Sequence, residues 1–172
     1  MNAFVLSQFL AGIAFAFGLA SFQLKERRSV LVCLCISCLF SSSHFLLLSR
    51  PAPAALTIIT AVRFLTAVFI VDRKVMYFFV FVSLCVFFAT YQNALSYLAL
   101  IATVLGTYAS FLSIDRWMRI LIMIGTSIWL VHNVLAGTPV AAIMEASLLT
   151  SNIIGYKRFY VDKEAELREK QG

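Results

Sequence analysis

Long apolar runs separated by short polar turns extend along almost the whole chain. The runs approach the roughly 20 apolar residues that a helix needs to cross a hydrocarbon core about 30 Å thick. They are continuous rather than alternating, which excludes a membrane-spanning β-barrel. The pattern therefore predicts seven transmembrane helices, at residues 3–22, 29–48, 54–71, 75–90, 94–114, 117–135 and 140–156.

Composition supports lipid as the surrounding solvent. Hydrophobic residues make up 62% of the 172 residues and charged residues 13%, against roughly 45–50% and 25% in soluble domains. The net charge of +6 comes from basic residues that gather in the turns, so it indicates membrane orientation rather than nucleic-acid binding. Residues 1–22 lack a basic leader segment, and we expect them to remain as the first helix.

The basic residues are distributed unequally between the two sides of the membrane. The turns after the first, third and fifth runs and the final tail hold twelve of them, whereas the opposite side holds only Arg50. Because cytosolic loops carry the excess of Lys and Arg, the N-terminus is expected outside and the C-terminus in the cytosol. The twelve residues are Lys25, Arg27, Arg28, Arg73, Lys74, Arg116, Arg119, Lys157, Arg158, Lys163, Arg168 and Lys170.

A three-helix unit is predicted to occur twice. The triplet Ala-Ser-Phe precedes a charged turn at residues 20–22 and again at 109–111, with Arg27 and Arg116 at the same place. Histidines at 44 and 132 each lie seven residues before the proline that starts the next run. The predicted organisation is a first unit at 1–74, a linker helix at 75–93, a second unit at 94–160 and a charged cytosolic tail at 161–172.

Several segments resemble the YgjV family of bacterial inner-membrane proteins. They are Glu26-Arg27-Arg28, residues 44–48, Ala61-Val62-Arg63, residues 129–133, Ala136-Gly137, Met144-Glu145 and residues 151–154. The 3+1+3 plan also resembles the SWEET sugar transporters and their PQ-loop (MtN3-like) relatives. The resemblance implies an all-α bundle of two parallel three-helix units in the bacterial inner membrane, with a substrate site between them. The interior prolines of SWEET hinges are absent from the first, second, fifth and sixth runs.

Polar residues within apolar runs are the candidate site. An ionisable side chain at the bilayer centre costs roughly 2.5–3.5 kcal/mol, so it is expected to face the bundle interior. Arg63 and Glu145 are such residues, and they are predicted either to bind substrate or to form a structural ion pair across a cavity. The resemblance to SWEET proteins adds Asn152 and Trp129 as substrate contacts, with Arg63 favouring a polar or anionic solute; interhelical bonding and packing are the alternatives.

Three further residues are predicted near the outer ends of their runs. His44 and His132 are repeat mates, and Asn133 follows His132. They are expected to act as an outer gate or, with Glu145, as a proton relay; the alternative is that both histidines are ordinary buried residues.

Motifs for catalysis or cofactor binding are missing. The chain has no H-E-x-x-H, no G-x-S-x-G and no glycine-rich phosphate loop. The C-x-x-C at Cys35 and Cys38 lacks the second ligand pair that a metal site needs. We therefore expect no enzyme activity, no cofactor and no bound metal.

The sequence predicts a small-molecule transporter or permease of PQ-loop type. The alternatives are a membrane-embedded receptor or ligand-binding protein, which the missing hinge prolines favour, and a structural protein without transport. The expected partners are the lipid bilayer and a small ligand of unknown identity, with no nucleic acid; homo-oligomer formation is left open.

Overall fold

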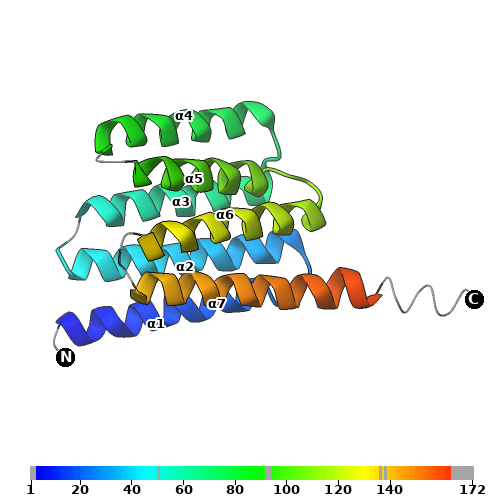
Figure 1. The fold of residues 1–172 in the computed structure, drawn as a ribbon, viewed down its shortest axis with the longest axis horizontal. Helices are drawn as coiled ribbons and strands as arrows, with labels where there is room; N and C mark the ends of the chain where they lie inside the picture. Colours follow the sequence, from blue (N-terminus) through cyan, green and yellow to red (C-terminus); the bar gives the residue numbers. More distant parts are fainter. Residues whose placement is uncertain (1–2, 50, 92–93, 136, 138, 164–172) are drawn as a thin grey trace, which may run out of the picture. The chain divides into compact units, whose positions relative to one another are not determined.

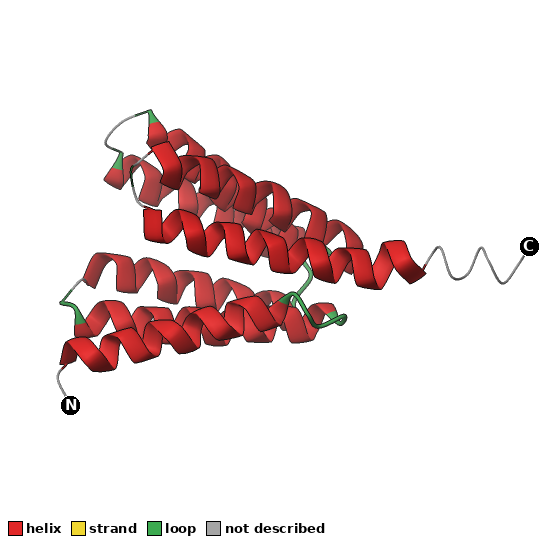
Figure 2. Ribbon diagram, turned by 60° about the horizontal axis from the view of Figure 1, so that its bottom comes forward, coloured by secondary structure: helices red, strands yellow, loops and turns green. Residues whose placement is uncertain are grey.

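Seven α-helices make up nearly all of the chain that the structure describes (Figure 1). The structure is a computed structural model that describes residues 3–49, 51–91, 94–135, 137 and 139–163. Figure 2 shows these residues as helices joined by short loops. The helices are α1 (Ala3–Ser21), α2 (Arg27–Leu47), α3 (Pro51–Phe69), α4 (Arg73–Thr90), α5 (Leu95–Ser110), α6 (Asp115–Leu135) and α7 (Pro139–Tyr156), and α7 continues as the π-helix η1 (Lys157–Val161). The all-α prediction is confirmed.

The chain divides into two compact units, residues 1–70 and 71–172. In unit 1, α2 packs against both α1 and α3. In unit 2, α6 packs against both α5 and α7, and α4 packs against α5. Each unit therefore contains a triple in which the second helix lies between the first and the third.

The turn between the second and third helices has the same construction in both triples. Ser49 and Gly137, 88 residues apart, adopt left-handed backbone conformations with φ of 55° and 67°. Their amides donate to Leu46 O and Val134 O, at 3.0 and 3.1 Å. A left-handed residue just past a helix end is a common helix stop, and proline suits the first position of the next helix. The same backbone turn thus occurs after α2 and after α6.

Small residues line the packed side of the first helix in each triple. Ser7, Ala14, Gly18 and Ser21 are the buried residues of α1, and Ala102, Thr107, Ala109 and Ser110 are those of α5. Small side chains let membrane helices approach closely. The Ser37 hydroxyl of α2 consequently donates to Ala14 O of α1 at 2.6 Å.

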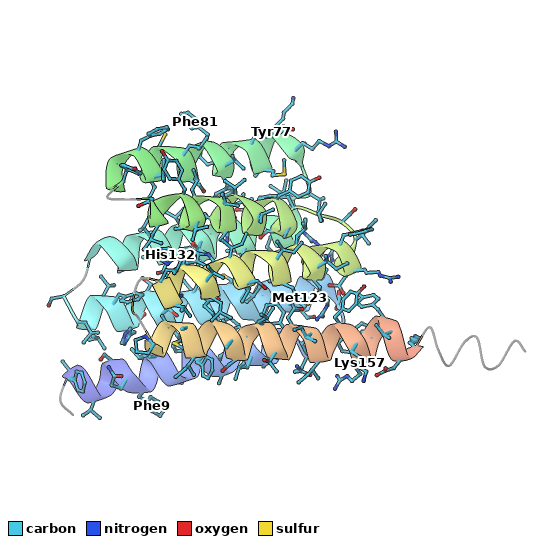
Figure 3. All side chains as sticks on the ribbon, in the orientation of Figure 1. Phe9, Tyr77, Phe81, Met123, His132 and Lys157 are labelled. Atoms are coloured by element: carbon cyan, nitrogen blue, oxygen red, sulfur yellow. The ribbon has the colours of Figure 1, made fainter. Side chains whose placement is uncertain are left out.

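The outer faces of the helices are apolar. Phe9, Tyr77 and Phe81 point outward in Figure 3 and are 62–64% exposed. Among the described helices, α1, α2 and α6 are long and apolar enough to cross a membrane. A soluble protein would not leave so many large aromatic side chains in water, so lipid is the medium that suits this surface.

Candidate functional site

Arg63 is a buried cation on α3, with 9% of its surface exposed. It lies twelve residues after the first residue of α3 and six before the last. Its guanidinium lies 4.9 Å from the Phe64 ring centroid and within electrostatic range of the Cys38 thiol, near the middle of α2. Helical side chains lean toward the N-terminus of their own helix. The Arg63 side chain is therefore expected to extend away from the cytosolic end predicted for α3, toward the middle of the helix.

Asn152 of α7 is almost completely buried, at 1% exposure. Its side-chain amide donates to the backbone carbonyl of Arg119 in α6 at 3.1 Å. This bond fixes the amide so that Oδ1 points elsewhere, and Oδ1 is buried without a hydrogen-bond partner among the described residues. Asn152 thus joins α6 to α7 and keeps one acceptor available.

Arg119 belongs to a buried polar cluster that the sequence analysis missed. The prediction counted it as a cytosolic loop residue, but α6 begins at Asp115 and Arg119 is fully buried within it. Its Nε lies 3.0 Å from Oδ2 of Asp115, one turn earlier. Its guanidinium lies 5.3 Å from the Phe159 ring centroid of η1. The i, i+4 spacing of Asp115 and Arg119 was the sequence signal for this pair.

Tyr160 closes the cluster from η1. Its hydroxyl donates to the same Asp115 Oδ2 that accepts from Arg119. Burial, together with this bond to a carboxylate, raises the pKa of Tyr160 from 10 to about 12. The phenol consequently remains a donor at physiological pH. A π-helix turn is unusual, and here it brings Phe159 and Tyr160 onto the start of α6.

The first arginine of each second helix ties the third helix to it. Arg27 Nη2 donates to Ala67 O at 2.9 Å in unit 1. Arg116 Nε donates to Tyr156 Oη at 3.0 Å in unit 2. Both members of the second pair lie 89 residues after their counterparts, so the two bonds occupy equivalent places. In unit 2 a tyrosine hydroxyl replaces a backbone carbonyl as the acceptor.

The predicted outer residues have different surroundings in the two units. His44 Nδ1 donates to Ser7 O of α1 at 2.8 Å; a carbonyl can only accept, so the proton lies on Nδ1. His132 instead packs edge-on against Trp129, with ring centroids 5.2 Å apart. Its Nδ1 lies 3.4 Å from Asn133 Oδ1. Both histidines lie in the last turn of their helices, and their gate or relay role stays a prediction.

Glu145 is half-buried on α7, six residues after Pro139. The structure brings Asn152 together with Arg119, and Trp129 with His132, all within unit 2. Arg63 belongs to unit 1, and its predicted pairing with Glu145 stays a prediction. Among the described residues, no three His, Cys, Asp or Glu side chains lie close enough together to hold a metal ion. Cys33, Cys35, Cys38 and Cys85 are free thiols.

Apolar helices with lipid-facing aromatic surfaces and charged residues at their ends define a helical integral membrane protein. Residues 5–163 match the Imp-YgjV family, described as bacterial inner membrane protein. The chain therefore belongs to the YgjV family. It is 28% identical over 160 residues to inner membrane protein YgjV of Escherichia coli (strain K12), covering 93% of this chain and 87% of the relative. No solved structure matches the chain.

Proposed function

We propose that this protein is a transporter or permease for a small polar or anionic solute, of the PQ-loop type. In this proposal all seven helices span the membrane, with the N-terminus outside and the C-terminus in the cytosol. Two parallel triples, α1–α3 and α5–α7, are joined by α4 in a SWEET-like 3+1+3 plan. The protein acts without catalysis, cofactor or nucleic acid, and homo-oligomer formation is left open.

The duplicated triple is the observation that carries the proposal. The same left-handed turn recurs 88 residues apart, and the same arginine bond recurs 89 residues apart. Repeats related by an axis along the membrane normal are one plan of secondary transporters, in which polar groups near the bilayer midplane bind substrate. We assign solute contact to Arg63 in unit 1 and to Trp129, Glu145 and Asn152 in unit 2. His44, His132 and Asn133 would serve as outer gating or proton-relay residues.

Solute flux into proteoliposomes tests the proposal. Vesicles containing the full chain are mixed with a neutral hexose, an amino acid or a hydroxycarboxylate, and their swelling is followed by light scattering. We expect swelling faster than that of protein-free vesicles for at least one solute class. Arg63→Gln should abolish the difference, whereas Arg73→Gln, which changes an exposed arginine at the start of α4, should preserve it.

One observation favours a structural or receptor role without transport. The side-chain amide of Asn152, the predicted substrate contact, already donates a hydrogen bond to the backbone carbonyl of Arg119. A bond of this kind between two helices is typical of a structural asparagine in a membrane bundle. Vesicles that show no flux for any solute would select this alternative. Thermal stabilisation of the protein by one of the same solutes, without flux, would then indicate a receptor.

A further inference from the structure

One face of α7 remains exposed along its length and changes from apolar to cationic at the helix end. Ile153 and Ile154 are 50% and 52% exposed. Lys157 and Arg158 follow them by four residues and are also exposed. Residues four apart on a helix lie one above the other, so each cation follows an isoleucine along the same face. This is the polarity profile of a phospholipid, with a charged head beyond an apolar chain.

The two cations are presented by an ordered turn rather than by a loose tail. On the other side of the same turn, Phe159 lies against the Arg119 guanidinium and Tyr160 donates to Asp115. The Arg158 guanidinium lies 4.7 Å from the Phe159 ring centroid. Figure 3 shows Lys157 extending from the side of α7 away from α6. Contacts to α6 thus fix the position from which Lys157 and Arg158 project.

We infer that the α7–η1 end is a binding site for an anionic phospholipid. The headgroup phosphate lies between Lys157 and Arg158, and an acyl chain lies along Ile153 and Ile154. Arginine and lysine side chains place their charge at the membrane surface while their apolar stems remain in lipid. A phosphodiester carries one negative charge on two oxygens, and the two cations can each donate to one of those oxygens. Lys163 offsets the nearby Asp162 in this part of the chain.

The end of α3 carries no cation at the matching positions, and the basic residues that follow it, Arg73 and Lys74, belong to α4. Val68 and Phe69 stand 89 residues before Lys157 and Arg158. Phe69 is 77% exposed, and an aromatic ring in that position offers apolar contact without charge. The inference does not depend on transport, but it rests on the proposal that α7 spans the membrane and ends at its surface.

Lipid-dependent thermal stability of the full chain in detergent micelles is the test. Dioleoyl-phosphatidylglycerol is titrated against dioleoyl-phosphatidylcholine, and glycerol phosphate is added alone as a headgroup without acyl chains. We expect phosphatidylglycerol to raise the unfolding midpoint saturably and the other two additives to have little effect. Lys157→Gln with Arg158→Gln should weaken the apparent phosphatidylglycerol affinity about 10- to 100-fold, the loss expected when a charge-assisted contact to the phosphate is removed.

The matched control is Arg73→Gln with Lys74→Gln, which removes two exposed adjacent cations from the start of α4. It should keep the phosphatidylglycerol effect. Equal loss in both double variants would show a diffuse charge effect and overturn the site. Equal stabilisation by phosphatidylcholine, or by glycerol phosphate alone, would overturn it as well. Lys157→Arg with Arg158→Lys should retain the effect, which separates charge from any disturbance of the turn.

Discussion

Arg63 and Arg119 are both buried arginines in apolar helices, but they are set in different surroundings. Arg119 has a carboxylate one turn earlier, an aromatic ring beside it and a side-chain amide on its own carbonyl. Arg63 lies beside Phe64 and near Cys38, and the helices of unit 1 contain no Asp or Glu. Unit 2 therefore neutralises its buried cation within its own triple, whereas the helices of unit 1 supply no carboxylate for theirs.

At the 89-residue spacing of Arg27 and Arg116, Arg119 corresponds to Val30 and Asn152 corresponds to Arg63. The turns before α3 and α7 match at 88 residues, which would pair Arg63 with Ser151 instead. Each triple thus has one buried arginine where its second and third helices meet. In unit 1 this arginine lies on the third helix, α3, and in unit 2 it lies on the second helix, α6. The arginine of unit 2 points back toward the start of α6, and that of unit 1 points inward along α3. Arg119 is therefore a structural cation, whereas Arg63 is the candidate functional one.

Removing the Asp115 carboxylate should have the largest effect. Asp115→Ala leaves the fully buried Arg119 without its acid and removes the acceptor of Tyr160. A broken buried ion pair typically costs about 3 kcal/mol or more. We expect a loss of that size in the free energy of unfolding, measured by detergent denaturation in mixed micelles.

The equivalent residue in unit 1, Glu26, provides the control. It is exposed, and its carboxylate accepts a hydrogen bond from the Ser29 hydroxyl. Glu26→Ala should change the free energy of unfolding by about 0.5 kcal/mol at most. Replacing Arg119 by Met in the Asp115→Ala background should recover stability, since no charge then remains buried. A cost in Glu26→Ala as large as that in Asp115→Ala would remove the distinction between the units.

The helix positions could be predicted from the sequence, because they rest on local signals. The runs predicted at 3–22 and 140–156 agree to within one residue with α1, Ala3–Ser21, and α7, Pro139–Tyr156. The Arg119 cluster was missed, although Asp115 has the spacing of an ion pair. The reason is that the positive-inside rule assigns charges near a run end to water, and the contacts with Phe159 and Tyr160 depend on a π-turn that has no sequence signal.

The second-largest effect should separate the two arginines directly. Arg119→Leu removes the cation but leaves the Asp115 carboxylate at the packed start of α6, and we expect a loss of about 2–3 kcal/mol. Arg63→Leu leaves no carboxylate behind in the helices of unit 1, so its cost should be smaller, about 1 kcal/mol or less. Unfolding in mixed micelles measures both. A strongly destabilised Arg63→Leu would mean that Arg63 holds helices together as Arg119 does.

A smaller effect is expected from the paired arginine bonds. Arg27→Met and Arg116→Met each remove one bond between the second and third helices of a triple. Each should cost about 1–2 kcal/mol, the range for a hydrogen bond from a charged donor. Tyr156→Phe tests the second bond without changing charge and should cost about 1 kcal/mol by the same unfolding assay. An unchanged Tyr156→Phe would show that the tyrosine hydroxyl is not needed to hold Arg116 there.

The smallest effect concerns the crossing of the first two helices in each triple. Ser37 donates to Ala14 O in unit 1, and 88 residues later a Cβ added to Gly125 would lie 3.4 Å from Ala102 O. That distance is an ordinary contact, and a serine hydroxyl there could donate to the same carbonyl. Gly125→Ser should therefore raise the free energy of unfolding by about 0.5–1 kcal/mol, from better helix propensity and one interhelical bond.

The reverse change sharpens this last comparison. Ser37→Gly should lower the free energy of unfolding by a similar amount, because it removes the bond to Ala14 and adds backbone freedom in the middle of α2. Gly125→Ala, which adds the Cβ without a hydroxyl, separates propensity from hydrogen bonding. If Gly125→Ser is less stable than Gly125→Ala, the α5–α6 contact does not have the geometry of the α1–α2 contact. The 88-residue spacing between the two pairs would then be a feature of the sequence alone. If the serine variant is the more stable of the two, the hydroxyl makes in unit 2 the bond that Ser37 makes in unit 1.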